Sequence, residues 1–225
     1  SIVVEIHAST MRYEDKPAIL AFVRDITKRK RIEQAEREAR QVAETLRKIG
    51  IALSATLDFN RVLDKLLELL KGLVPYDSGC VLMVEGFQVR PVRWLGYDRF
   101  NSRAVQTISG ITWNISEIPT LSRMLESKKP LVIPDVTRSK EWIDIAGLSH
   151  IRSWVGAPIL IRQEVVAFFS LDCCEAGFYT PRHGELLSLY CVQAALALEN
   201  ARLYQELQEH RQHLEKTVAD RTAQL

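Results

Sequence analysis

The sequence lacks the features that mark several specialised classes of protein. Its four cysteines have neither the density of a disulfide framework nor the spacing of zinc ligands. No apolar stretch reaches the roughly 18 to 20 residues that a membrane-spanning helix needs. The 30 basic and 28 acidic side chains leave a net charge of only +2, without the clustered basic excess of a nucleic-acid binder. We therefore expect reduced thiols in the cytoplasm, no membrane span and no nucleic-acid partner.

The beginning of the chain also lacks the marks of a natural start. The segment SIVVEIHAS has no initiator Met and no basic region ahead of an apolar one, which argues against a signal peptide. We interpret the chain as a fragment of a longer protein. The remaining composition, 47% hydrophobic and 26% charged over 225 residues, is typical of one or two ordinary globular domains.

Residues 1–27 differ sharply in composition from the segment that follows them. Ile, Val, Phe and Ala alternate or cluster in residues 2–6 and 18–25, around a turn with Asp15 and Pro17, which predicts a β-hairpin. The next stretch, KRKRIEQAEREARQVAETLRK, has no Gly or Pro and predicts a long helix. Apolar residues recur along this helix in the alternating steps of three and four that are typical of a two-stranded coiled coil, namely Ile32, Ala35, Ala39, Val42, Leu46, Ile49 and Leu53. The alternative is one amphipathic helix packed on its own domain.

The middle of the chain predicts a sheet with a covering helix. Asp58 is placed to cap a helix with a wide apolar face that ends before Pro75. Strands are expected at residues 80–84, 87–95, 155–161 and 165–171. Between the two strand pairs, residues 116–127 predict a helix, 130–133 a short strand and 139–146 one or two helical turns. An irregular segment that crosses a sheet face is a common place for a small-molecule pocket.

A final long helix is predicted from Pro181, with Thr180 as its cap, to the end of the chain. Its first half is apolar enough to be buried, whereas its second half is mostly polar and should project and pair with a second copy. The expected seam positions in this helix are Leu196, Asn200, Leu203, Leu207 and Leu214, and His210 falls on the same line. Beyond Leu214 the spacing changes at Val218 and Leu225, which predicts local unwinding.

Residues 58–204 resemble a GAF domain of bacterial signalling proteins, most specifically in KKPLVIPDV and in RSWVGAPILIRQEVVAFFSLDCCEAGFYTPRHGELLSLYCVQAALALENARLY. The resemblance implies an α+β fold with a central antiparallel sheet, flanking helices and a ligand pocket on one face. Residues 1–27, which end in FVRDITKRK, resemble the last two strands of a PAS domain. The tail HLEKTVADRTAQL resembles the helix that leads into the phosphoacceptor helices of sensor histidine kinases. We expect a PAS remnant at 1–27, a coiled-coil linker at 28–57, a GAF domain at 58–200 and a signalling coiled-coil helix at 201–225.

The resemblance suggests a small-molecule pocket whose lining is expected to include Asp135, Trp142, Trp154 and Phe168. The alternative is that both tryptophans are plain core and that Asp135 caps the helical turn near Ser139. The signature residues of cyclic-nucleotide GAF domains are not found, and residues 147–150 read GLSH where a bilin-binding relative carries Cys before His. The ligand is therefore left unidentified, with cyclic nucleotides and bilins disfavoured.

Two further groups have a possible chemical role. His150 is a candidate axial ligand for haem, although an isolated His is more often a surface or hydrogen-bonded residue. Cys173 and Cys174 are candidates for redox chemistry of the kind found in a GAF subfamily that reduces free methionine sulfoxide, but no basic neighbour activates them. No grouping of residues suggests a catalytic or metal site. We expect a homodimeric regulatory module of a sensor histidine kinase that relays signals to an effector domain in the same chain, with a cysteine-dependent reductase or a haem sensor as alternatives.

Overall fold

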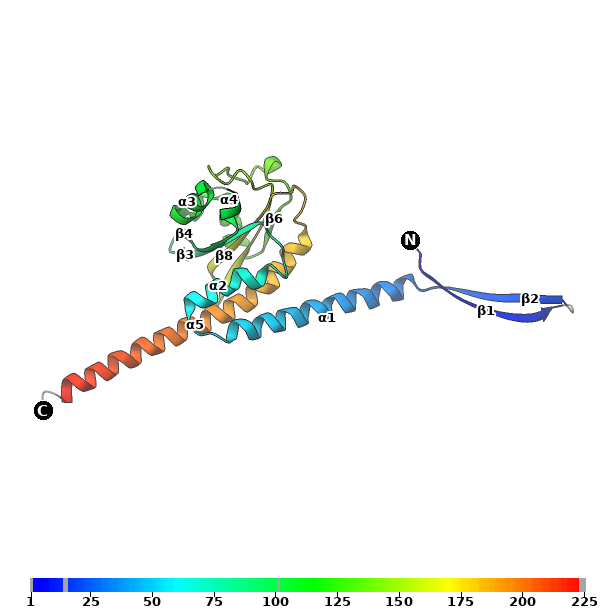
Figure 1. Cartoon of the computed structure of the whole chain (residues 1–225), viewed down its shortest axis with the longest axis horizontal. Coiled ribbons are helices and arrows are strands. Elements are labelled where there is room, and N and C mark those ends of the chain that lie inside the picture. The colour runs from blue at the N-terminus through cyan, green and yellow to red at the C-terminus, as the bar shows by residue number, and fades with distance from the viewer. Residues whose placement is uncertain (1, 14–15, 101, 223–225) are drawn as a thin grey trace. The chain divides into compact units, whose positions relative to one another are not determined.

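The computed structural model describes residues 2–13, 16–100 and 102–222 (Figure 1). The chain divides into two compact units, Ser1–Thr45 and Leu46–Leu225. The helix α1 (Thr27–Ser54) begins in the first unit and ends in the second. No helix within the described ranges is both long enough and apolar enough to cross a membrane.

The first unit contains the predicted hairpin. Strands β1 (Val4–Tyr13) and β2 (Lys16–Asp25) pair antiparallel, with Val4 opposite Asp25. The Asp25 carboxylate accepts a hydrogen bond from the Thr27 backbone N–H (2.8 Å) and so opens α1. Apolar side chains of the hairpin are exposed, including Ile6 (61%) and Phe22 (65%). Ile6 pairs with Val23, the residue after Phe22, and successive residues of a strand point to opposite faces, so Ile6 and Phe22 lie on opposite faces of the hairpin. The predicted turn residue Asp15 lies outside the described residues.

The second unit is built on a six-stranded antiparallel sheet in the order β5-β4-β3-β8-β7-β6, which confirms the predicted α+β fold. The strands are β3 (Ser78–Glu85), β4 (Gln88–Leu95), β5 (Trp113–Asn114), β6 (Leu131–Ile133), β7 (Ser153–Ile161) and β8 (Glu164–Cys173). Alternation along β8 turns Phe169 and Leu171 to one face of the sheet and Phe168 to the other, so each face has its own hydrophobic cluster.

Helices α2 (Phe59–Leu70) and α5 (Pro181–Thr222), with the end of α1, pack on the face of Phe169 and Leu171. The predicted Asp58 cap of α2 is confirmed, because its carboxylate accepts from the Arg61 backbone N–H (2.8 Å). Helix α5 begins at Pro181 as predicted, and the hydroxyl of Thr180 is hydrogen-bonded to the His183 side chain at Nδ1 (3.1 Å). Here Ile49 and Leu53 of the expected N-terminal seam are buried in the chain's own core, and Leu46 packs against it. These positions therefore follow the alternative of a helix packed on its own domain.

The opposite face carries shorter elements: η1 (Tyr97–Arg99), α3 (Ser102–Gly110), η2 (Ile115–Glu117), α4 (Pro119–Ser127) and η3 (Val136–Arg138). The single helix predicted at 116–127 is split into η2 and α4 because Pro119 starts a new helix at its first position. The prediction of helical turns at 139–146 is wrong, because those residues form an irregular loop that continues to β7. Residues 102–110 form a helix that the sequence did not indicate.

The β7–β8 hairpin is closed by a turn without glycine. Arg162 and Gln163 both have positive φ, 50° and 70°, a backbone region that costs a residue with a side chain about 1 kcal/mol or more. The Arg162 guanidinium also forms an ion pair with Glu199 of α5 (3.1 Å). The sheet is thereby joined to the long C-terminal helix at the tip of this hairpin.

Candidate functional site

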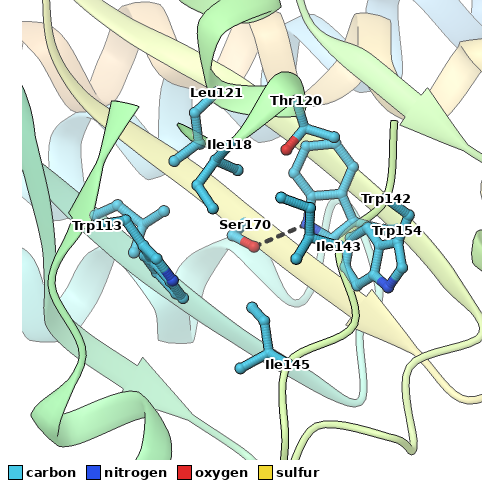
Figure 2. Close-up of a pocket in the computed structure, with 10 residues that line it drawn as sticks. Trp113, Ile118, Thr120, Leu121, Trp142, Ile143, Ile145, Trp154 and Ser170 are labelled. Atoms are coloured by element: carbon cyan, nitrogen blue, oxygen red, sulfur yellow. Dashed lines mark hydrogen bonds between the residues drawn. The ribbon is translucent and has the colours of Figure 1, made fainter. Parts of the chain in front are cut away.

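A small cavity lies on the face of the sheet that carries the short helices. Its volume is about 60 Å³, and it opens between the sheet, α4 and the irregular loop before β7 (Figure 2). Trp113 lies on one side of it, and Trp142 and Trp154 lie on the opposite side. The full lining is Leu82, Trp113, Ile118, Thr120, Leu121, Trp142, Ile143, Ile145, Trp154 and Ser170. This position agrees with the crossing segment where the sequence predicted a pocket, but the volume is far below the roughly 300 to 1,000 Å³ of a drug-sized site.

The cavity is small because Trp154 folds over the strand that carries it. Its indole Nε1–H donates a hydrogen bond to Ser170 Oγ on the neighbouring strand (2.8 Å), which Figure 2 shows as a dashed line. The six-membered ring covers Gly156, where a Cβ would overlap the ring. Trp142 packs against Trp154 with ring centroids 5.9 Å apart and planes tilted by 56°. The absence of a side chain at Gly156 therefore creates the space that the indole fills.

The structure brings two of the four expected lining residues to the cavity. Trp142 and Trp154 line it, whereas Phe168 is fully buried in the hydrophobic cluster beneath and Asp135 lies elsewhere. Asp135 caps η3, accepting from the Thr137 backbone N–H (3.1 Å) and Oγ1 (2.7 Å), and these bonds, led by the hydroxyl, lower the pKa of its carboxyl. Sequence reasoning missed Ser170, although its strand parity with Phe168 places it on the pocket face.

Three buried polar side chains and a half-buried histidine meet at the start of β3 and the end of β8 on the same face, and we call this group the Asp172 cluster: Asp172, Tyr97, Ser78 and His150. Asp172 is 1% exposed, and its Oδ2 accepts from the Tyr97 hydroxyl (2.6 Å) and the Ser78 hydroxyl (3.0 Å). With Asp172 ionised, Ser78 gives its one proton to the carboxylate, and its oxygen then accepts from the Nε2–H of His150, 3.0 Å away.

Burial controls the protonation of the Asp172 cluster. It raises the pKa of Asp172 to about 7, against the lowering effect of its two hydrogen bonds. It also lowers the pKa of His150, whose Nδ1 is buried without a hydrogen-bond partner among the described residues. The ring of His150 stacks on Phe100 with centroids 3.7 Å apart. His150 is thus held neutral and turned toward Ser78, outside the lining of the cavity.

The cofactors considered from the sequence do not fit this site. Haem does not fit, because the cavity is too small and His150 Nε2 is already bonded to Ser78. A bilin thioether has no sulfur to form from, because none of the four cysteines lines the cavity. Across the described ranges of the chain, no cluster of three or more His, Cys, Asp or Glu side chains is arranged to hold a metal ion.

The adjacent thiols Cys173 and Cys174 lie at the end of β8, beside Asp77. Desolvation raises the pKa of both thiols, that of the buried Cys173 and that of the exposed Cys174, and the Asp77 carboxylate raises it further, to about 12 for Cys174. Thiols with raised pKa values are almost fully protonated at neutral pH and are therefore poor nucleophiles. This environment does not favour the cysteine-dependent reductase considered from the sequence.

Known proteins resemble this chain in sequence and fold. An uncharacterized sensor-like histidine kinase from Chloroflexus aurantiacus is 24% identical over 196 residues, covering 83% of this chain but only 31% of that protein. The GAF domain of a phosphoenolpyruvate-protein phosphotransferase from Coxiella burnetii superposes with a TM-score of 0.61 at 15% identity, covering 73% of this chain and 96% of that one. A free methionine-R-sulfoxide reductase from Neisseria meningitidis, solved with its substrate, also has a TM-score of 0.61 at 14% identity, covering 74% and 93%.

The structural neighbours are too distant in sequence to show more than a common fold. The family model for the GAF domain, however, matches residues 58–198, which is more than half of the chain and includes all six strands of the second unit and the cavity. The chain therefore belongs to the GAF domain family.

Proposed function

We propose that this chain is a sensor module of a signalling protein that acts as a parallel homodimer. A small molecule binds at the cavity, and the packing of the paired α5 helices reports its presence to an effector domain in the same chain. The sensor-like histidine kinase relative supports such an effector. The ligand must bind one helix packing more tightly than the other; a tenfold to hundredfold preference corresponds to about 1.4 to 2.7 kcal/mol.

The observation that carries this proposal is a second apolar face on α5. Leu187, Tyr190 and Leu198 turn into the core of the unit and are at most 2% exposed. On other sides of the same helix, large apolar residues remain exposed in steps close to the seam spacing, namely Leu189, Val192, Leu196, Leu203, Leu207 and Leu214. A helix with one apolar face buried and another exposed is stabilised when the second face packs on a partner helix. The seam includes the exposed polar residue Asn200, which favours a fixed register. The change of spacing expected at Val218 and Leu225 concerns side chains outside the described residues.

The first unit fits the same proposal. Two strands with exposed apolar side chains on both faces are marginal by themselves, which supports assigning residues 1–27 to a PAS domain. Residues 28–57 would link it to the GAF domain at 58–200, and 201–225 would form the signalling helix. Ile32 is 50% exposed and remains available for pairing, as do Ala35, Ala39 and Val42, none of which is buried. The four free thiols suit the reducing cytoplasm, where we place the module.

We infer that the chain by itself is not an enzyme. The raised pKa values of Cys173 and Cys174 disfavour thiolate chemistry, and the cavity has no lining cysteine. Incubating the protein with free methionine sulfoxide and a thiol reductant checks this. Turnover that disappears in Cys173→Ser or Cys174→Ser would restore the reductase alternative.

Disulfide cross-linking tests the dimer. In a background with the native cysteines replaced, Leu203→Cys and Leu214→Cys should each form a disulfide-linked dimer under mild oxidation. Gln205→Cys is the matched control, because two residues further along the helix its side chain points about 200° away from Leu203 and should not cross-link. A monomeric mass by light scattering at micromolar concentration, or equal cross-linking at Gln205, would contradict the parallel pairing and with it the relay.

A further inference from the structure

The space next to the cavity is occupied by a side chain of the protein itself, the indole of Trp154. The Trp154 side chain is almost wholly buried: its indole occupies the space where a Cβ of Gly156 would lie, a space that the Met124 methyl group also borders, and the Trp142 ring packs against it at a tilt of 56°. We call this space the Trp154 socket. The open cavity of about 60 Å³ adjoins it, so removal of the indole would join the two volumes.

The chemistry of the socket is apolar with a few polar groups. None of the described residues that line the cavity is charged, so a charged ligand would lose its hydration without gaining an opposite charge from them. The hydroxyl of Ser170 accepts the indole N–H, and the buried Thr120 adds a second hydroxyl to the lining. The socket thus accepts a flat, uncharged ring that carries an N–H donor.

One wall of this region is a loop, which is tied to α4 by the ion pair between Arg123 and Glu141 (2.7 Å) and not by strand pairing. Trp142 and Ile143 belong to the irregular loop between η3 and β7, which lacks the ladder hydrogen bonds of the strands, and Ile143 is exposed. Trp154 itself is anchored to the sheet at its backbone, while its side chain is retained by one hydrogen bond and by packing. Movement of the loop would therefore give the indole a way out of the socket without breaking the sheet.

We propose that the ligand is a neutral, flat heteroaromatic molecule with an N–H donor, and that it binds by displacing the Trp154 indole from its socket and taking over the bond to Ser170. This inference rests on the proposed ligand-sensing function and specifies it. The apo protein is then a self-occupied state, in which the indole competes with the ligand for the same site. Displacement couples binding to a change in side-chain packing on β7 and β8, whose connecting turn is paired with Glu199 of α5.

Competition makes a quantitative prediction about affinity. A ligand that needs an open socket binds with an apparent affinity reduced by the fraction of molecules in which the socket is open. Calorimetric titration of the full chain with indole should therefore give at least tenfold tighter binding to Trp154→Ala than to the unsubstituted protein. Indene, which has the shape of indole but no N–H, should bind Trp154→Ala more weakly than indole does, and adding Ser170→Ala should remove that difference. Trp94→Ala is the control, because Trp94 does not line the cavity.

Nuclear magnetic resonance of the unsubstituted protein provides a test that does not depend on the folding of Trp154→Ala. The four tryptophans give four indole N–H signals, assigned by single replacements with Phe. Saturating benzimidazole should shift the Trp154 signal and speed its hydrogen exchange at least tenfold, while the Trp94 signal stays in place. Equal affinity of indole for the two proteins, no binding of any probe to folded Trp154→Ala, or a bound probe that leaves the Trp154 N–H protected would overturn the inference. A probe that binds with Trp154 still in its socket would retain the proposed sensor function, whereas loss of dimer cross-linking would refute the relay independently.

Discussion

The buried carboxyl group of Asp172 predicts an unusual dependence of stability on pH. Its folded pKa is about 7, whereas the ordinary value is 3.8, so the folded protein retains a proton there that the unfolded chain releases. Stability from this group is fully present below pH 3.8 and is lost as the pH rises through 7. The substitution Asp172→Asn keeps an oxygen to accept from Tyr97 and Ser78 and removes the ionisation. The variant should therefore lack this loss at neutral and alkaline pH.

The size of the effect follows from the two pKa values. Each pKa unit corresponds to 1.36 kcal/mol, and between pH 5 and pH 8 the linkage relation gives a loss of roughly 2 to 3 kcal/mol for Asp172. Burial lowers the pKa of His150 and of His183, so these two residues contribute with the opposite sign in the same range. These two histidines are present in both proteins, so comparing the variant with the unsubstituted protein at each pH cancels the contribution to stability that they make equally in both.

Urea unfolding of both proteins at half-unit steps from pH 5 to pH 8 measures this difference. We expect the free energy of unfolding of Asp172→Asn, relative to the unsubstituted protein, to rise by about 2 kcal/mol across the range, or by several degrees in Tm. Parallel stability curves for the two proteins would refute the reasoning, because they would show that Asp172 has the same pKa in both states. A constant loss of stability added to the expected pH-dependent rise would show that the amide also fits less well than the carboxyl, without affecting the pKa argument.

Two further substitutions test the local geometry of the sheet. Gly156→Ala should destabilise the protein by about 1 to 3 kcal/mol, because the new Cβ overlaps the Trp154 ring, whereas the control Gly110→Ala meets no atom within 4 Å and should be neutral or slightly stabilising by thermal unfolding. Gln163→Gly should raise the free energy of unfolding by about 0.5 kcal/mol, because it relieves a positive φ in the β7–β8 turn. As the control, Glu164→Gly at the neighbouring position in the extended strand should lower the free energy of unfolding. An unchanged Tm for Gln163→Gly would show that the turn is not strained.

The local elements of this protein could be predicted from its sequence wherever one periodicity or one capping residue decided the outcome. The positions of the main strands, the Asp58 cap and the Pro181 start depend on residues within a few positions of each other, and all three agree with the structure. The GAF family was recognisable because its most specific blocks lie in these regular elements. The sequence wrongly predicted helical turns at 139–146 and gave no indication of the helix at 102–110. Both segments are weakly patterned, and such segments take their conformation from the sheet on which they pack.

The seam and the site show what only tertiary structure decided. The spacing of Ile32 to Leu53 is uniform, yet Ile49 and Leu53 are buried in the chain's own core, because burial depends on where the sheet and α5 lie and not on the repeat itself. In the same way, sequence could suggest Trp154 as a pocket residue but not that its indole would fill the pocket, since that outcome needs the missing Cβ of Gly156 on its own strand and the hydroxyl of Ser170 on the next. Residues far apart in sequence are brought within hydrogen-bond distance by strand register, and no local pattern records which pairs will meet.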